Sequence, residues 1–178
     1  MNTGIELYYT HRPKMRTGDL LLWKSDTLLG KLIRLFTDSN HASLILRFRK
    51  QFEGVRKRRF LLEALEHGIT LALISDRLKN FKGEAYWYPV KDAYNPLRDG
   101  VASWALNEVG TPYDFRSLFR NALGRVSTDA NNLFCSEYFF LAWQSQIPDL
   151  LSPWGEGKAP RPGDLPKLGL FRKPVRVF

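Results

Sequence analysis

The sequence predicts a single α+β domain built around an antiparallel sheet. The chain has 178 residues, the length of one ordinary domain, and 44% of them are hydrophobic, enough to bury a core. Short strand-like runs dominate the first half, and two of them, 41–48 and 59–65, are joined by a turn-forming segment. Apolar residues at helical spacing follow in 95–110 and 136–146.

The first expected strand is Leu20–Trp23, a short apolar run behind the turn signal Thr17-Gly18-Asp19. Residues 1–15 carry no clear periodicity and are expected to form an irregular lead-in. An amphipathic helix should run from the N-cap pair Ser25-Asp26 to Thr37. The later expected elements, in chain order, are strands 41–48, 59–65 and 68–72, a helical turn at 75–79, strand 84–90, helix 95–110, a short helix or loop at 115–123, helix 136–146 and an edge strand at 175–178.

The C-terminal part of the chain differs in composition from the rest. Prolines recur from Pro148 to Pro174, which disfavours a helix. Its apolar residues, such as Trp154 and Phe171, indicate a coil that packs over the core. We therefore expect one domain over 1–178, with a core at about 17–146 and a proline-rich extension at 147–178.

The predicted hairpin carries a strongly basic tip between Arg47 and Arg59, with a turn at Glu53-Gly54. The whole chain has a net charge of +9 and an isoelectric point of about 9.8, which indicates an anionic partner such as an acidic membrane surface. Nucleic acid is not favoured because no nucleic-acid motif accompanies the charge. Basic strands at 47–59 are equally typical of a solvated sheet edge that resists edge-to-edge pairing.

A single cysteine excludes an intrachain disulfide and a cysteine-rich zinc site, so we expect neither a metal nor another cofactor. The first residues lack the long apolar run of a secretory signal. The sequence also contains no stretch near the roughly 18 apolar residues that a membrane span needs. These features predict a soluble, cytoplasmic protein, and they leave the oligomeric state open.

The one cysteine, Cys135, is the first candidate for chemistry. It follows a turn-rich run at 127–132 and opens the apolar helix predicted for 136–146. Unpaired backbone N–H groups and the positive end of the helix dipole would favour the thiolate there. The alternative is a packed, inert cysteine, because free cysteine is among the most buried residue types. Nearby Glu137 is interpreted as a first-turn acid that interacts with the helix dipole.

A cysteine nucleophile needs a histidine base, and the base needs an orienting group. His11 lies in the irregular lead-in and His67 at an exposed turn, whereas His41 begins a strand where its ring can project into a cleft. If the hairpin folds about 52–54, Glu63 lies on the paired strand within a few residues of directly opposite His41. A register slip of one residue would turn Glu63 to the other face and leave Glu66 as the alternative.

Five short blocks of the sequence together resemble a known family. They occur in the order Gly18–Trp23, Ser39–Ile45, Leu62–Ala64, Gly110–Asp114 and Phe134–Glu137. In this order, with histidine before cysteine, they resemble the circularly permuted, YiiX/YaeF-like branch of the NlpC/P60 papain-like hydrolases. The blocks span most of the chain, from about residue 17 to 146.

The resemblance implies a papain-like, circularly permuted core in which an antiparallel sheet packs against the cysteine-bearing helix. It implies Cys135 as the nucleophile, His41 as general base and acid, and Glu63 as the group that orients His41. It also places Tyr113 near the active site. The backbone N–H of Cys135 or Ser136, at the expected helix start, would stabilise the oxyanion of the substrate.

The resulting hypothesis is a cysteine amidase or peptidase that cleaves an amide bond through a Cys-His-Glu triad and a thioacyl intermediate. A second hypothesis is a lipid-acting thiol acyltransferase or phospholipase, whose basic hairpin would engage an acidic membrane. A third is a binding module that has kept the fold without turnover. The presence of all three expected catalytic side chains argues against the third hypothesis.

Overall fold

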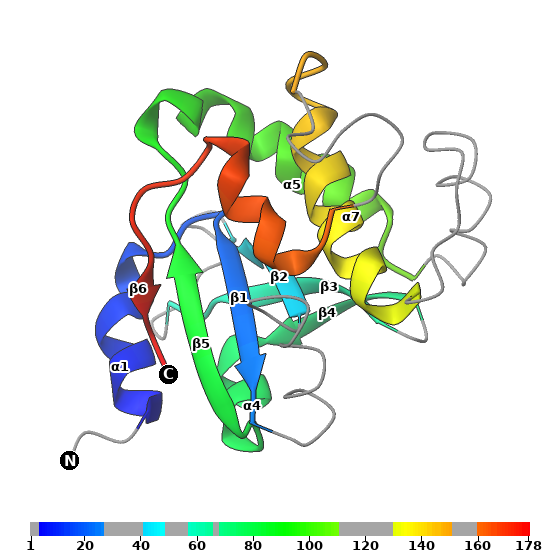
Figure 1. The fold of residues 1–178 in the computed structure, drawn as a ribbon. Coiled ribbons are helices and arrows are strands. Elements are labelled where there is room, and N and C mark those ends of the chain that lie inside the picture. Colours follow the sequence, from blue (N-terminus) through cyan, green and yellow to red (C-terminus); the bar gives the residue numbers. More distant parts are fainter. Residues whose placement is uncertain (1–3, 27–40, 49–56, 66–67, 111–129, 151–159) are drawn as a thin grey trace.

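The computed structural model describes residues 4–26, 41–48, 57–65, 68–110, 130–150 and 160–178, and its secondary structure is drawn in Figure 1. In chain order the elements are α1 (Gly4–His11), η1 (Arg12–Lys14), β1 (Leu20–Ser25), β2 (His41–Leu46), β3 (Phe60–Leu65), β4 (Gly68–Leu73), α4 (Ile74–Lys79), β5 (Gly83–Tyr88), η2 (Asp92–Leu97), α5 (Arg98–Asn107), α7 (Ala130–Gln144), η3 (Pro162–Leu168) and β6 (Val175–Arg176).

Six strands form one sheet in the order β4-β3-β2-β1-β5-β6, and every neighbouring pair is antiparallel. Strand β1 lies at the centre and pairs with β2 from Leu20↔Leu44 to Trp23↔His41. Strands β2 and β3 are the two arms of the predicted hairpin. The described residues therefore form the expected α+β fold with an antiparallel sheet.

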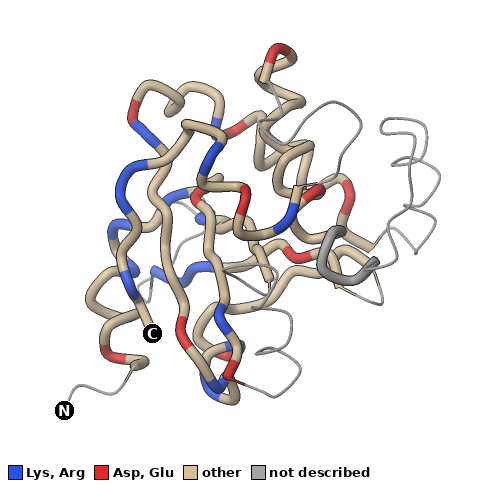
Figure 2. The backbone as a smooth tube through the Cα atoms, in the orientation of Figure 1, with Lys and Arg blue, Asp and Glu red and all other residues tan. Residues whose placement is uncertain are grey.

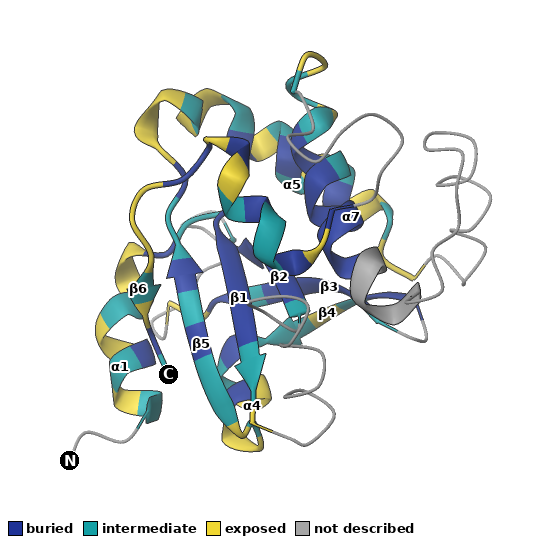
Figure 3. Ribbon diagram, viewed as in Figure 1, coloured by how far each residue is buried: buried dark blue, intermediate teal, exposed yellow. Residues whose placement is uncertain are grey.

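Alternation along the strands divides the buried residues between two faces of the sheet. On one face, Leu22, Leu44 and Leu62 pack with residues of α5, α7 and η3 in a single apolar cluster. On the other, Leu21, Ile45 and their neighbours pack with residues of α1 and α4. Figure 3 shows the central strands and α7 as the most deeply buried elements. The cysteine-bearing helix thus covers one face of the sheet, as predicted.

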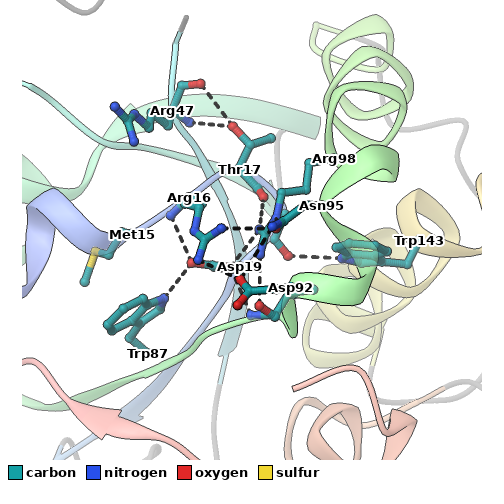
Figure 4. Close-up of polar contacts among 12 residues, drawn as sticks. Met15, Arg16, Thr17, Asp19, Arg47, Trp87, Asp92, Asn95, Arg98 and Trp143 are labelled. Carbon is teal, nitrogen blue, oxygen red and sulfur yellow. Dashed lines mark hydrogen bonds and ion pairs between the residues drawn. The ribbon is translucent and has the colours of Figure 1, made fainter. Parts of the chain in front are cut away.

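The Gly18-Asp19 turn before β1 is a buried structural junction (Figure 4). The two carboxylate oxygens of Asp19 accept four hydrogen bonds, at 2.8 to 3.0 Å, and the donors are the backbone N–H of Arg16, the backbone N–H of Val90, Trp87 Nε1 and Arg98 Nη1. Because Arg98 begins α5 and is itself buried, this ion pair joins the helix to the sheet. The motif therefore has a clear role in folding.

Gly18 is required at this junction for two independent reasons. Its φ of +82° lies in the left-handed region, where a side chain is strained. A Cβ on Gly18 would also lie 2.8 Å from a ring carbon of Trp143 on α7. The Trp143 indole N–H donates to the Gly18 carbonyl at 3.1 Å, so α7 is fastened directly to the start of β1.

Three expectations about the elements were wrong. Residues 4–11 form helix α1 rather than an irregular lead-in, because Tyr8 is buried against the sheet. Helix α7 begins at Ala130, so Cys135 is its sixth residue and does not stand at the helix start. The proline-rich extension contains the 3₁₀ helix η3 instead of coil alone, although it packs over the core as expected, with Leu165 fully buried. The final edge strand was predicted correctly and forms β6 at the end of the sheet.

The described ends of the basic hairpin differ in their surroundings. Lys57 and Arg58 are exposed, whereas Arg59 is buried and donates hydrogen bonds to the backbone carbonyls of Met15 and Pro13. Arg59 therefore fastens η1 to the beginning of β3. In Figure 2 the described lysines and arginines gather mainly on the side that carries α1 and β6.

Several predicted features lie outside the described residues. They are the helix at 26–37, the hairpin turn at 49–56, Glu66, His67, Tyr113 and the segment 115–123. Within the described part of the chain, the helices are too short or too polar to cross a membrane.

Candidate active site

The candidate site lies where β2 and β3 separate. Pairing between these strands runs from Leu46↔Phe60 to Leu44↔Leu62 and does not continue to the first residues of β2. The Ile45 N–H donates to Asp19 on the β1 side, so the N–H of Ala42 points toward β3. It meets the sulfur of Cys135 instead of a β3 carbonyl, at an N···Sγ distance of 3.4 Å. The gap between the strands thus admits the thiol.

Cys135 is 1% exposed and belongs to the apolar cluster between the sheet and α7. It therefore has the burial of an ordinary core cysteine. Its polar contacts distinguish it, because the thiol is hydrogen bonded to the His41 side chain in addition to Ala42. The predicted pairing of cysteine and histidine is present in the structure.

His41 is the first residue of β2, and its side chain is 17% exposed. Its Nε2 lies 2.8 Å from Oε1 of Glu63, which leaves Nδ1 for the thiol. Glu63 is 1% exposed and lies on the same face of the sheet as His41. The strand register therefore brings together the three residues chosen from the sequence, Cys135, His41 and Glu63, and selects Glu63 as the partner of His41.

The pKa values of His41 and Glu63 are shifted in opposite directions. Burial alone would lower the pKa of His41, but the charge and hydrogen bond of Cys135 and those of Glu63 outweigh it and raise this pKa to about 10. Burial raises the pKa of Glu63, but the hydrogen bond and charge of His41, followed by Arg77 and Ser43, hold it below its usual value. At neutral pH the pair is an imidazolium beside a carboxylate.

Two further side chains contact this pair, and a third bonds to one of them; none of the three was singled out from the sequence. The Ser43 hydroxyl donates to Glu63 Oε1 at 2.7 Å, and the indole N–H of Trp23 donates to Ser43 Oγ at 2.8 Å. Arg77 of α4 lies 3.5 Å from Glu63 Oε2. Ser43 could have been found from the alternation of the strand, because it is two residues from His41. Arg77 could not, because only the tertiary structure brings α4 to β3.

The remaining residues of interest have different positions from those expected. Ser136 is fully buried, and its hydroxyl donates to the carbonyl of Pro160. Because α7 begins at Ala130, the backbone N–H groups of Cys135 and Ser136 lie inside the helix and not among its first four unpaired donors. Glu137 is the eighth residue of α7 and not a first-turn acid; it is 6% exposed, and desolvation raises its pKa to about 7.

Comparisons with known proteins bear on the fold and the family of this chain. A crystal structure titled as metalloprotein yiiX from Escherichia coli O157:H7 aligns with a TM-score of 0.52 and 20% identity, covering 75% of this chain and 67% of that chain. Within the described residues of our chain, no three His, Cys, Asp or Glu side chains are grouped to hold a metal ion.

A search of curated proteins found no significant match. The model of one family, described as permuted papain-like amidase enzymes, YaeF/YiiX, C92 family, matches residues 14–149. This range contains the whole candidate site and most of the sheet. The chain therefore belongs to the C92 family of permuted papain-like amidases.

Proposed function

We propose that this protein is a cysteine hydrolase that cleaves an amide bond through Cys135, His41 and Glu63. The observation that carries the proposal is the continuous run of hydrogen bonds from the thiol through the imidazole to the buried carboxylate. A nucleophile, a base and an orienting group in contact are what acyl transfer requires. Membership in an amidase family supports the same reaction class.

In the proposed mechanism, the sulfur of Cys135 attacks the carbonyl carbon of the substrate as a thiolate. The His41 imidazolium gives its proton to the leaving amine, the C–N bond breaks, and a thioacyl intermediate remains on Cys135. Neutral His41 then takes a proton from water, whose oxygen attacks the thioester carbonyl. The carboxylic acid leaves, and the sulfur and the imidazolium are restored.

The neighbouring groups have supporting roles in this mechanism. Glu63 holds the Nε2 proton of His41 and stabilises the positive ring. The backbone N–H of Ala42 stabilises negative charge on the sulfur between turnovers. Tyr113 remains a predicted substrate-binding residue, and the basic segment 47–59 remains a predicted contact for an anionic surface. Ser136 is not proposed to bind substrate, because its hydroxyl is buried against Pro160 and its N–H lies inside α7.

The proposal can be tested with 4-nitrophenyl acetate as a general acyl donor. The wild type should release 4-nitrophenol and gain one acetyl group, which intact mass and peptide mapping place on Cys135, the only cysteine in the chain. Cys135→Ala should abolish the modification, and His41→Ala should slow it at least about 100-fold. Equal acetylation of wild type and His41→Ala would remove His41 as the activating base.

The substrate class requires a second measurement on the same variants. A peptide library is expected to give cleavage products with the wild type and none with Cys135→Ala. Cysteine-dependent release of fatty acid from phosphatidylglycerol vesicles, without peptide cleavage, would replace the amidase proposal with the lipid-acting alternative. Binding of peptides without acetylation of Cys135 would support the binding module.

A further inference from the structure

Two buried side-chain hydrogen bonds in series connect Trp23 and Ser43 to the Glu63 carboxylate. Ser43 is 1% exposed and Trp23 is 2% exposed, so neither exchanges hydrogen bonds freely with water. Trp23 lies on β1, Ser43 on β2 and Glu63 on β3, so the contacts cross three adjacent strands. They run from Trp23 Nε1 to Ser43 Oγ and from Ser43 Oγ to Glu63 Oε1.

The chemistry of these groups fixes the direction of each hydrogen bond. An indole N–H can only donate, so the Ser43 oxygen must accept from Trp23. The single hydroxyl proton of Ser43 is therefore left for Glu63 Oε1, the same oxygen that contacts His41 Nε2. An oxygen held in this way is an acceptor, so His41 carries a proton on Nε2 and presents Nδ1 to Cys135.

We propose that Ser43 and Trp23 are positioning residues for the reaction, acting through Glu63 to fix the orientation and tautomer of His41. This inference rests on the proposed function, because it assumes that His41 activates Cys135. Without the Ser43 hydroxyl, the carboxylate keeps only His41 and the half-exposed Arg77 as partners, so its Oε1 is aligned less strictly with the ring. Without the Trp23 N–H, no donor fixes the Ser43 oxygen, so the hydroxyl can rotate about its Cβ–Oγ bond and points less strictly at Glu63.

Two features separate this role from ordinary packing. The contacts end on one defined carboxylate oxygen and not on a backbone group. The chain also offers a matched control, because the buried Trp87 donates its indole N–H to Asp19 Oδ2 at 2.9 Å, away from the thiol. Trp87→Phe and Trp23→Phe thus remove the same kind of hydrogen bond in two places.

The test measures the rate constant of Cys135 acetylation by 4-nitrophenyl acetate against pH. Ser43→Ala should lower it about tenfold, the effect of losing one hydrogen bond to a charged group, and Ser43→Thr should restore most of it. Trp23→Phe should lower the rate constant about threefold, whereas Trp87→Phe should leave it unchanged. The thermal stability of both variants is measured as well, so that a loss of folded protein is not taken for a loss of rate. Because Ser43 helps to keep Glu63 ionised, the acid limb of the profile should move to higher pH in Ser43→Ala alone.

A double-mutant comparison decides whether the two residues act through Glu63. In a Glu63→Ala background, Ser43→Ala should change the rate constant less than about twofold. An equal fall in both backgrounds, or an unshifted acid limb, would overturn the inference. If His41→Ala lowers acetylation and Ser43→Ala does not, the inference fails alone. If His41→Ala has no effect, the proposed function fails as well. If Ser43→Ala does not fold, the comparison of the Trp23→Phe and Trp87→Phe rate constants tests the inference instead, and equal values would overturn it.

Discussion

His41 shows how neighbours from different elements set the chemistry of one side chain. Its own burial opposes the positive form, but a thiol from α7 and a carboxylate from β3 reverse that effect. Burial also strengthens the attraction between the positive ring and its negative partners, because less water screens their charges. The sequence suggested these partners through the expected hairpin, whereas their contact depends on the separation of β2 from β3.

At this scale, replacing the carboxylate should move the pH profile in a known direction. His41 stays protonated up to about pH 10, and the negative charge of Glu63 contributes to that raised pKa. In Glu63→Gln the imidazolium should lose its proton at lower pH, so the alkaline limb of Cys135 acetylation shifts downward. The His41 ring can be titrated by NMR as a direct measure. Glu84→Gln, a change on β5, is the control, and an unmoved limb in Glu63→Gln would contradict the assignment.

A second prediction concerns Glu137, whose pKa is raised to about 7 by burial. The unfolded chain releases this proton near pH 4.5, whereas the folded chain keeps it up to about pH 7. The free energy of unfolding therefore falls as the pH rises from 4.5 to 7. Above pH 7, Glu137→Gln should therefore stabilise the fold by roughly 1–3 kcal/mol, with much less gain at pH 5. Urea unfolding at pH 5 and 8.5 measures the difference. An equal effect at both values would exclude a titrating Glu137.

At the scale of elements, strands were easier to predict than helix boundaries. Alternating or continuous apolar runs between turns located β1 to β5 to within one or two residues. The start of α7 was missed because the polar residues at 127–132 favour a turn, although helix begins at Ala130. Helix α1 was missed because its local sequence is weakly helical, and burial of Tyr8 supplies the missing stability.

The junction of elements at Asp19 gives a direct test of packing energetics. Asp19→Ala removes one partner of a buried ion pair and leaves Arg98 uncompensated, so it should cost about 3–5 kcal/mol of unfolding free energy. Asp92→Ala is the matched control, because Asp92 pairs with Arg16 and Arg172 on the exposed surface and should change stability little. Denaturant unfolding measures both variants. Similar losses in the two would show that burial of the pair is not what matters.

At the scale of the whole molecule, the C-terminal segment completes both apolar clusters. Leu165, Leu170 and Phe171 contribute to the α7 side, and Val177 contributes to the opposite side. Strand β6 also pairs with β5 at the end of the sheet. Residues from both ends of the chain therefore lie around the same central strands (Figure 1).

Deletion of residues 148–178 should consequently abolish cooperative unfolding, because it exposes both clusters and leaves β5 without its neighbour. The single change Leu165→Ala should cost about 2–5 kcal/mol while the chain still unfolds in one transition. Thermal unfolding followed by near-ultraviolet circular dichroism distinguishes the two outcomes. A deletion variant with the wild-type melting temperature would show that the extension is only an accessory.

By itself, the sequence determined the class of fold and most of the strands, because residue type and period-two alternation are local properties. Together with its resemblance to a known family, it also singled out Cys135, His41 and Glu63 as candidate site residues. Only the tertiary structure decided that Glu63 meets His41, that Ser43 and Trp23 lie behind it, and that α7 places the thiol at Ala42 from its second turn. These contacts join β1, β2, β3 and α7, and their distances depend on strand register and helix packing rather than on any one segment.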